Sequence, residues 1–437
     1  MKPIHVGLLG LGTVGGGTLT VLRRNQAEIT RRAGRAILVK MAAVRDLSKA
    51  QTAYASEDIK ITTNPLDVVE NPDIDIVVEL IGGTDQAKDL VLKAIANGKH
   101  VVTANKALLA MHGNEIFAAA QAKGVMVAFE AAVAGGIPII KAVREGLSAN
   151  RIEWVAGIIN GTTNFILTEM RDKGLAFDTV LAEAQRLGYA ESDPTFDIEG
   201  VDAAHKLTIL AAIAFGIPMQ FDKAYIEGIS KLTKEDIQYA EELGYRIKLL
   251  GITKRVAQGI ELRVHPTLIP TKRLIANVEG VMNAVLVKGD AVGATLYYGR
   301  GAGAEPTASA VVADLVDVTR MHTADPEHRV PHLAFQPDAL SDAPILPMSE
   351  VRTAYYLRMR AFDQPGVLAD ITRILADLEI SIDAMIQKEP DEGQALVDII
   401  MLTHVTVEKN VNQAIAKIEA LSTISGKVTR LRLETLG

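Results

Sequence analysis

The sequence predicts an α/β protein, in which a doubly wound parallel sheet is followed by an α+β region and a small βαββαβ domain. Three observations predict this order. Short apolar runs alternate with helical patterns up to about residue 130, which is typical of a parallel sheet with crossover helices. Segments with the pattern of antiparallel strands, with helices among them, follow over residues 131–305. After a proline-rich stretch, residues 353–437 follow the order strand, helix, strand, strand, helix, strand.

The first element is an apolar run of strand length, Ile4–Leu9. It is followed by the glycines of GLGTVG and by a helical pattern that extends to Ile29. Strand, GxGxxG and helix in this order form a dinucleotide-binding arrangement. The glycines permit a tight turn and close backbone approach, and the helix N-terminus attracts the pyrophosphate. We therefore expect NAD or NADP to bind at this turn.

Further strands and helices complete the predicted parallel sheet. They are expected at Ile37–Val44, Ile74–Leu80, His100–Ala104 and Val125–Phe129 (strands) and at Asp85–Asn97 and Gly113–Lys123 (helices). The second strand is followed by Arg45 and Asp46. An acid at this position usually binds the ribose hydroxyls of NAD, whereas a nearby arginine accommodates the phosphate of NADP. The pair favours NADP only mildly. The alternative is that Arg45 and Asp46 are two ordinary charged residues of a loop.

The middle region mixes strands with helices. Strands are expected at Ile152–Ile159, Gly259–Pro266 and Asn283–Lys288, and helices at Asp178–Leu187, Asp202–Phe215 and Lys234–Leu249. A helix with an apolar face over Thr307–Thr319 is expected to return to the first domain. Residues 321–352 carry five of the sixteen prolines together with His322, His328 and His332. A proline-rich connector gives histidines no rigid frame for binding a metal, so this stretch is interpreted as a linker.

The tail is interpreted as a separate domain. Its strands are expected at Tyr355–Phe362, Ile380–Gln387, Ala395–Val405 and Lys427–Glu434, and its helices at Val367–Leu378 and Val411–Leu421. The residues Pro390, Asp391, Glu392 and Gly393 have the composition of a turn between the two middle strands.

The segment 188–206, GYAESDPTFDIEGVDAAHK, has the composition of a chemical site. It holds five carboxylates and ends on Lys206. Asp202 and Lys206 are four residues apart in a helical pattern, so both side chains lie on one face. The helix that follows is largely apolar, which places the charges where this helix meets a cleft. A lysine held beside carboxylates in a cleft can act as an acid–base group.

Other polar motifs have more than one interpretation. Lys106 follows a strand that ends at the ligand crevice, where it could neutralise a substrate carboxylate or hydrogen-bond its oxygen. The connector 129–138 is either a hinge or a set of backbone carbonyls for an alkali cation, with Glu130 adding charge. Residues 160–164 form a turn with an N-cap and could also line the cleft. Residues 300–306 are either a plain turn or a place where backbone approaches the cofactor.

Composition excludes several classes of function. The net charge of −7 argues against a nucleic-acid partner. The absence of cysteine excludes disulfides, thiolate metal sites and any covalent thiol mechanism. The longest apolar stretch, Leu207–Met219, is shorter than the ~20 residues that cross a bilayer. The first strand leaves no room for a signal peptide before it, so a cytoplasmic protein without a membrane partner is expected.

Together these segments resemble homoserine dehydrogenase, in its monofunctional bacterial form with a C-terminal ACT domain. The resemblance covers nearly the whole chain and rests on the order of GLGTVGGG, TANKALLA, FEAAVAGGIPII, GIINGTTNFIL, LGYAESDPTFDIEGVDAAHKL and YYGRGAGAEPTASAV. The tail resembles an ACT domain through FDQPGVLADITRIL. No aspartokinase region precedes the first strand, so the chain does not resemble the fused bifunctional enzyme.

The resemblance implies a division into domains. It comprises a Rossmann-type NAD(P)-binding domain over 1–130, onto which helix 305–320 packs, a substrate-binding, catalytic and dimerisation domain over 131–305, a linker over 321–352, and an ACT regulatory domain over 353–437. A homodimer or homotetramer is implied as well.

The resemblance also implies roles for individual residues. Lys206 matches the proton donor, and Asp202 and Lys106 complete the catalytic set. Homoserine is bound by Glu191, Asp197, Asp202 and Lys106. The cofactor is contacted by Gly10, Leu11, Gly12, Thr13, Val14, Gly15, Arg45, Thr84, Lys106, Gly188 and Gly303. A sodium ion is held by Glu130, Val133, Gly135 and Ile137.

The implied reaction is the reversible reduction of L-aspartate 4-semialdehyde to L-homoserine by NAD(P)H, in threonine, methionine and isoleucine biosynthesis. Threonine is the expected effector of the ACT domain, near Asp363 and Gly366, although a purely structural dimerisation module is the alternative. Aspartate-semialdehyde dehydrogenase needs a cysteine and is excluded. The remaining alternatives are a nicotinamide oxidoreductase acting on a sugar or another amino acid, and a nucleotide-sensing regulator with an amino-acid-binding tail. The regulator would give no reason for the pair Asp202–Lys206 in a cleft.

Overall fold

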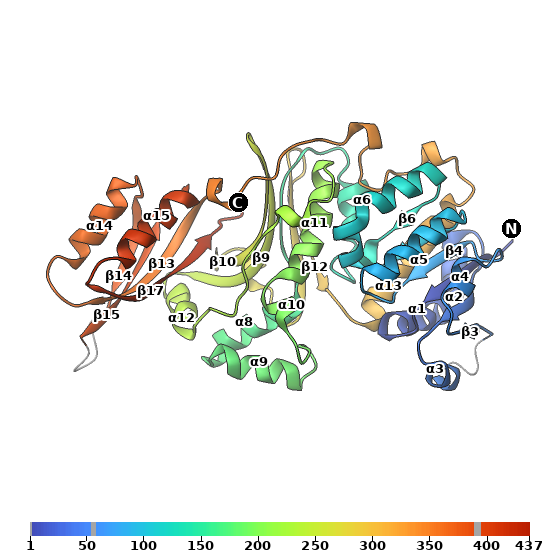
Figure 1. Cartoon of the computed structure of the whole chain (residues 1–437), viewed down its shortest axis with the longest axis horizontal. Helices are drawn as coiled ribbons and strands as arrows, with labels where there is room; N and C mark the ends of the chain where they lie inside the picture. The colour runs from blue at the N-terminus through green and yellow to red at the C-terminus, as the bar shows by residue number, and fades with distance from the viewer. Residues whose placement is uncertain (1, 54–57, 389–394) are drawn as a thin grey trace. The chain divides into compact units, whose positions relative to one another are not determined.

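The computed structural model describes residues 2–53, 58–388 and 395–437 (Figure 1). The chain forms two compact units, each assembled from three segments. The first compact unit comprises Met1–Gly161, Asp202–Ala224 and Val281–Ala343, and the second comprises Thr162–Val201, Tyr225–Gly280 and Pro344–Gly437. The chain therefore crosses between the units several times, and the domain boundaries expected from the sequence stay predictions.

A six-stranded parallel sheet forms the base of the first unit, as predicted. Its order is β3-β2-β1-β4-β5-β6. The strands are β1 (Ile4–Leu9), β2 (Ile37–Ala43), β3 (Lys60–Thr62), β4 (Ile76–Glu79), β5 (His100–Thr103) and β6 (Val127–Ala128). The sequence did not predict β3, which has three residues and too few apolar positions to stand out. The order runs outward in both directions from β1 and β4, which makes this a doubly wound sheet.

Helices cover this sheet on its crossovers. They are α1 (Thr13–Arg24), α2 (Gln26–Ala33), α3 (Leu47–Ala53), α4 (Leu66–Val69), α5 (Asp85–Ala96) and α6 (Lys106–Lys123). The single helix expected up to Ile29 is wrong, because Asn25 leaves the helical conformation and separates α1 from α2. Helix α6 begins earlier than the predicted Gly113. The Asn105 side chain accepts a hydrogen bond from the Leu108 amide and thereby caps its first turn.

Helix α13 (Ala304–Met321) returns to the parallel sheet and packs on α1. A Cβ at Gly17 would lie only 2.5 Å from the Ala304 carbonyl oxygen, so the two helices approach closely at this glycine. Leu19 and Leu22 of α1 share one apolar core with Val311 of α13.

The rest of the first unit contains three antiparallel strands and a buried helix. They are β7 (Ile152–Ile158), β11 (Met282–Gly289), β12 (Gly293–Arg300) and α11 (Val201–Phe215), with the short α7 (Ile139–Lys141). The order of the strands is β12-β11-β7. Helix α11 is buried on almost all sides, which its nearly continuous apolar sequence requires.

Between α13 and β13 (Arg352–Phe362), the segment interpreted as a linker forms short 3-10 turns, and two of its histidines are partly buried where they pack on the region of the parallel sheet. The His332 ring stacks on Phe117, and its Nε2 accepts the Val127 amide of edge strand β6 over 3.1 Å. His322 packs edge-on against His100, whereas His328 is exposed. The two partly buried histidines therefore attach this segment to the sheet.

The second unit is built on a mixed sheet of order β9-β10-β17-β13-β15-β14. Its strands are β8 (Tyr225–Ile226), β9 (Tyr245–Val256), β10 (Gly259–Pro270), β13 (Arg352–Phe362), β14 (Ile382–Gln387), β15 (Leu396–Thr403), β16 (Thr406–Val407) and β17 (Ile424–Leu433). Its helices are α8 (Gly161–Lys173), α9 (Phe177–Arg186), α10 (Thr195–Ile198), α12 (Lys234–Glu242), α14 (Val367–Asp377) and α15 (Glu408–Glu419).

The C-terminal module, defined as residues 353–437, has the predicted βαββαβ order. Helices α14 and α15 share an apolar core with the sheet strands β13 and β15 (Figure 1). The predicted turn at residues 390–393 lies outside the described residues. Every helix in the described part of the chain is too short or too polar to cross a membrane.

One predicted helix of the second unit is wrong in its second half. The helix expected over Lys234–Leu249 ends at Glu242, and residues 245–249 belong to strand β9. Gly244 adopts a left-handed conformation with a φ of 83°, which ends the helix and reverses the chain. Pairing of β9 with β10 along its whole length then outweighs the helical pattern of its first residues.

Candidate active site

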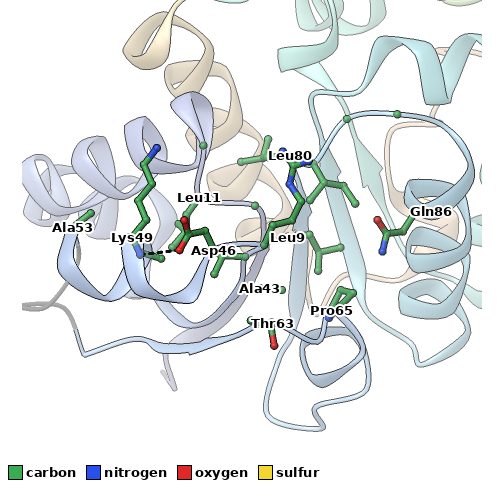
Figure 2. Close-up of a pocket in the computed structure, with 18 of the residues that line it drawn as sticks. Leu9, Leu11, Ala43, Asp46, Lys49, Ala53, Thr63, Pro65, Leu80 and Gln86 are labelled. Atoms are coloured by element: carbon green, nitrogen blue, oxygen red, sulfur yellow. Dashed lines mark hydrogen bonds between the residues drawn. The ribbon is translucent and has the colours of Figure 1, made fainter.

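A pocket of about 800 Å³ opens at the carboxyl ends of β1, β2 and β4 (Figure 2). Four segments line it: the β1–α1 turn, the β2–α3 loop with Arg45 and Asp46, the β3–α4 loop with Thr63 and Pro65, and the segment from Leu80 to Gln86. Since β1 lies between β2 and β4, the winding of the sheet reverses at this pocket. This is the position at which doubly wound sheets bind their ligands.

The β1–α1 turn has two positions that only glycine fits. Gly10 has a φ of 102°, and its Cβ would lie 3.0 Å from the Leu80 carbonyl oxygen. A Cβ at Gly15 would lie 2.2 Å from the Gly10 carbonyl oxygen, so the first turn of α1 closes tightly on the end of β1. Helix α1 starts at Thr13 and its N-terminus opens at the pocket, where it can bind a pyrophosphate.

The two charges after β2 differ in what holds them. The Asp46 carboxylate accepts the Lys49 amide over 3.0 Å and the Ser48 hydroxyl over 2.8 Å, which Figure 2 shows in part. These hydrogen bonds lower the pKa of Asp46, the Lys49 amide most of all. The carboxylate is thus engaged in capping α3, and Arg45 lines the same pocket as a cation.

The structure places the predicted cofactor residues in three groups. Gly10, Leu11, Gly12, Arg45 and Thr84 line the pocket. Thr13, Val14 and Gly15 form the first turn of α1, and Lys106 and Gly303 lie at the N-termini of α6 and α13. Gly188 follows α9 in the second unit, so its predicted contact with the cofactor stays a prediction.

The Asp202 carboxylate, in the first turn of α11, is surrounded by donors of the first unit. The Lys206 ammonium, one helical turn further on, lies 2.6 Å from its Oδ2, and the Lys106 ammonium lies 3.3 Å from its Oδ1. Asn160 donates to the same Oδ2 over 2.9 Å. Lys206 also donates to the Ile159 carbonyl over 2.9 Å, which fixes its ammonium between the end of β7 and α11.

Electrostatics keep this cluster charged. Burial alone raises the pKa of Asp202, but the ammonium groups of Lys206 and Lys106 outweigh it and lower this pKa to about 2. Asp202 therefore stays ionised throughout the neutral range. The side chains of Lys206 and Lys106 remain 12% and 35% exposed, so both cations keep access to solvent. A buried anion with two accessible ammonium groups can orient them towards a substrate oxygen.

His205 lies next to this cluster, and sequence reasoning did not single it out. Its ring packs on Phe221 with 4.3 Å between the centroids. Burial lowers the pKa of His205 to about 4, with Asp202 opposing the shift and the two lysines adding to it. A neutral imidazole therefore lies beside the charged cluster at neutral pH. Its only signal in the sequence is its place directly before Lys206.

A buried carboxylate at the end of β4, also missed by sequence reasoning, connects the pocket to Lys106. Glu79 accepts the amides of Ile81 and Gly82 and, over 2.6 Å, the Thr103 hydroxyl. Thr103 in turn accepts the Asn105 amide, and Asn105 donates to Gly83 in the pocket wall. Burial raises the pKa of Glu79, and these hydrogen bonds oppose the rise. The loop 80–84 and the start of α6 are therefore joined by one hydrogen-bonded ring.

The residues predicted to hold sodium form a compact turn in the first unit. Both carboxylate oxygens of Glu130 accept backbone amides, those of Ile140 and Lys141, over 2.9 and 2.8 Å. Burial, with Asp314 second, raises the pKa of Glu130 to about 7, and a cation beside it would oppose that rise.

The backbone of this turn bends sharply at Ala134 and Gly135, with φ values of 54° and 43°. A Cβ at Gly135 would lie 2.4 Å from the Gly301 carbonyl oxygen, so the two glycine-rich loops, 129–138 and 300–306, pack on each other. A buried carboxylate is a type of oxygen ligand that alkali cations accept, and the sodium site itself stays a prediction. Among the described residues, no group of three or more His, Asp or Glu side chains could hold a metal.

The remaining carboxylates of the 188–206 segment belong to the second unit. Asp193 accepts the Thr195 amide over 3.1 Å at the start of α10, the helix that contains Asp197. Gln185 donates to the backbone carbonyl of Glu191 over 3.1 Å, and the Glu191 side chain is exposed. Their predicted contacts with homoserine stay predictions.

The predicted regulatory residues lie in an exposed loop of the C-terminal module. Asp363 donates its amide to Ala395 over 3.1 Å, and Gly366, with a φ of 97°, is the N-cap of α14. Their assignment to an effector site stays a prediction.

Comparisons with known proteins extend over the whole chain. Residues 10–130 match the NAD-binding domain of homoserine dehydrogenase, residues 138–316 match the homoserine dehydrogenase family, and residues 355–423 match the ACT domain. Fold and pocket thus define an NAD(P)-binding oxidoreductase that carries a C-terminal ACT domain. The homoserine dehydrogenase of Pseudomonas aeruginosa is 67% identical over 437 residues, which is 100% of both chains. The chain belongs to the homoserine dehydrogenase family.

Solved structures agree with this assignment. The crystal structure of a homoserine dehydrogenase from Thiobacillus denitrificans is 78% identical, with a TM-score of 0.96 over 100% of this chain and 99% of that one. A hyperthermophilic archaeal homoserine dehydrogenase in complex with NADPH is 27% identical, with a TM-score of 0.62 over 73% of this chain and 98% of that one.

Proposed function

We propose that the protein catalyses the reversible NAD(P)H-dependent reduction of L-aspartate 4-semialdehyde to L-homoserine, in the biosynthesis of threonine, methionine and isoleucine. The observation that carries this proposal is the convergence of Lys206 and Lys106 on the buried Asp202, in the same unit as the dinucleotide pocket. Such a pair of oriented ammonium groups is what a carbonyl reduction needs at the oxygen that becomes an alkoxide.

The side chains have distinct roles in this proposal. Bound NAD(P)H supplies the hydride for the aldehyde carbon. Lys206 donates a proton to the carbonyl oxygen and, in the reverse direction, removes the hydroxyl proton of homoserine. Lys106 hydrogen-bonds the same oxygen, and Asp202 holds both ammonium groups in place. Glu191 and Asp197, together with Asp202, bind the α-ammonium of the substrate.

NADP is the proposed preferred cofactor. Because Asp46 is engaged by the Lys49 amide and the Ser48 hydroxyl, it is less available to the ribose hydroxyls of NAD. Arg45 lines the same pocket and its positive charge suits the 2′-phosphate of NADP.

A sodium ion, an effector and an assembly complete the proposal. Glu130 would hold sodium with the carbonyl oxygens of Val133, Gly135 and Ile137, and the ion would stabilise the packing of the two glycine-rich loops. The ACT domain would bind threonine and lower activity, and the enzyme would form a homodimer or homotetramer. A cytoplasmic location stays a prediction.

Steady-state assays test this function directly. We expect homoserine-dependent reduction of NADP, and more slowly of NAD, with inhibition by L-threonine. The substitution Lys206→Ala is expected to lower kcat by about 10²- to 10⁴-fold, because proton transfer to the carbonyl oxygen is lost. Nucleotide binding, followed by fluorescence quenching, should stay unchanged. Near-normal turnover of this variant would contradict the assignment of Lys206.

A further inference from the structure

The carboxylate of Glu227 connects the C-terminal module to residues 225–229, which lie outside this module in the second unit. Strand β17 of this module pairs in parallel with β10, which also pairs in parallel with β8. Glu227 follows β8 directly, and its amide donates to the Val264 carbonyl of β10 over 2.8 Å. The side chain of Glu227 is therefore presented to the residues of β17.

Two arginines and a tyrosine hold the Glu227 carboxylate. Arg432, fully buried in β17, donates to Glu227 Oε2 over 2.9 Å, and the Tyr225 hydroxyl donates to the same oxygen over 2.6 Å. Arg430 lies 3.5 Å away. Burial raises the pKa of Glu227, but Arg432 and the Tyr225 hydrogen bond outweigh it, so this pKa is lowered.

Arg432 is itself immobilised by the C-terminal module. Its guanidinium makes two hydrogen bonds to Glu408 of α15, over 2.8 and 2.5 Å, and Glu408 also accepts the Tyr355 hydroxyl over 2.9 Å. Glu408 is 2% exposed, so water does not compete for this pair. Glu408 thus fixes the orientation of the Arg432 guanidinium, which in turn holds the Glu227 carboxylate.

The backbone that follows Glu227, at residues 228–229, contacts residues 198–199 of the segment 188–206. Ile229 donates its amide to the Ile198 carbonyl over 2.8 Å. A Cβ at Gly228 would lie 2.4 Å from that same carbonyl oxygen and 2.5 Å from the Glu199 Cα, so the two backbones are in direct contact. Any shift of residues 227–229 must therefore move residues 197–199, which include the proposed substrate ligand Asp197.

We propose that Glu227 is a positioning residue for the substrate-binding segment and that Arg432 of the C-terminal module holds it there. The module thereby acts on the affinity for homoserine and not on the affinity for the nucleotide, whose pocket lies in the other compact unit. This inference rests on the proposed function, because it takes Asp197 as a substrate ligand. It adds a route by which events in the ACT domain bear on substrate binding.

The test compares the KM for homoserine in two variants, one that removes the charge of Glu227 and one that keeps it. Glu227→Gln removes the charge that Arg432 holds, and we expect the KM for homoserine to rise about five- to tenfold. Tyr225→Phe keeps the charge but removes the hydrogen bond that the hydroxyl donates to Glu227 and the one that it accepts from Arg432, and a smaller rise in the same KM is expected. The KM for NADP should stay within about twofold of the wild type in both variants, since their pocket residues are untouched.

The matched control is Glu279→Gln. Glu279 is also a carboxylate of the second unit held by two arginines, Arg171 and Arg246, but its hydrogen bonds lead to α8 and β9 and not to residues 195–200. We expect an unchanged KM for homoserine in this variant. Circular dichroism and thermal unfolding are measured for all three variants, and we expect all three to be folded.

Several outcomes would overturn the inference. A wild-type KM for homoserine in both Glu227→Gln and Tyr225→Phe would show that Glu227 does not position the substrate-binding segment. An equal rise in the KM for homoserine and in the KM for NADP would show that the substitution disturbs the whole protein. The same rise in Glu279→Gln would remove any specificity for Glu227. Failure of the proposed function is separate, because it appears as a wild-type enzyme that does not oxidise homoserine at all.

Discussion

Both compact units bury charge, but they do so in opposite ways. In the first, the buried Asp202 is paired with Lys206 and Lys106, whose side chains stay 12% and 35% exposed. In the second, Arg432 is fully buried and is paired with Glu408, which is 2% exposed. The first cluster leaves cations accessible to a ligand, whereas the protein itself satisfies the second.

This difference separates a site from a structural joint. Removing charges from water costs several kcal/mol per ion, and this cost is offset only by ion pairs and hydrogen bonds with the protein. Arg432 has a full set of such partners, with bidentate contact to Glu408 and further hydrogen bonds to Glu227 and Tyr225. At Asp202 the cations retain solvent access, which a substrate oxygen can replace. We therefore expect substitutions in the closed cluster to lower stability and substitutions in the open cluster to lower catalysis.

The largest expected effect is on the stability of the closed cluster. Glu408→Gln leaves the Arg432 guanidinium buried without its main counter-charge, so the free energy of unfolding should fall by about 3–5 kcal/mol. The measurement is chemical denaturation followed by fluorescence and circular dichroism. Glu350→Gln is the control, because Glu350 forms a half-exposed pair with Lys409 and should change stability by less than about 1 kcal/mol. Equal stability of the two variants would contradict the comparison.

The open cluster should respond in the opposite sense. Asp202→Asn keeps the size of the side chain and its hydrogen-bonding capacity but removes the anion that orients Lys206 and Lys106. We expect kcat for homoserine oxidation to fall by about 10²-fold or more, with nucleotide binding retained. Because the pKa of Asp202 is about 2, the wild-type activity should show no titration of this group above pH 4. A variant that loses stability but keeps kcat would assign Asp202 to the structural class.

Local patterns predicted those parts of the site that depend on short spacing. The glycine turn at residues 10–15 and the i,i+4 pair Asp202–Lys206 are set within one turn or one helix, so the sequence alone places them. The contact between Lys106 and Asp202 joins two helices far apart in the chain. Residue spacing could not supply it, and the family resemblance supplied only the roles.

The missed features depend on contacts between distant segments. Glu79 acquires its place from Thr103 on the neighbouring strand, and no periodicity reports such a pairing. The helix predicted over Lys234–Leu249 fails for the same reason, since β10 captures its second half as a strand. The parallel sheet, apart from β3, and the βαββαβ tail were predicted because their elements carry strong patterns of their own.

The smallest expected effect tests whether the comparison concerns openness or the identity of the unit. His332 lies in the first unit with Asp202, yet protein groups satisfy its ring: it stacks on Phe117, and its Nε2 accepts the Val127 amide. Burial lowers the pKa of His332 from the ordinary 6.5 to about 4. The unfolded chain therefore binds a proton between these values that the folded chain does not, and stability falls as pH drops below 6.5.

The expected loss between pH 7.5 and pH 5 is about 2 kcal/mol for this one histidine. It is measured as the shift in the midpoint of chemical denaturation between these two pH values. His332→Gln keeps an acceptor for the Val127 amide but cannot titrate, so its midpoint should depend less on pH by this amount. His328→Gln is the control, because His328 is exposed and its substitution should leave the pH dependence unchanged. An unaltered pH dependence in His332→Gln would mean that other groups cause the loss, and that a side chain satisfied by protein groups in the first unit does not behave as the cluster around Arg432 does.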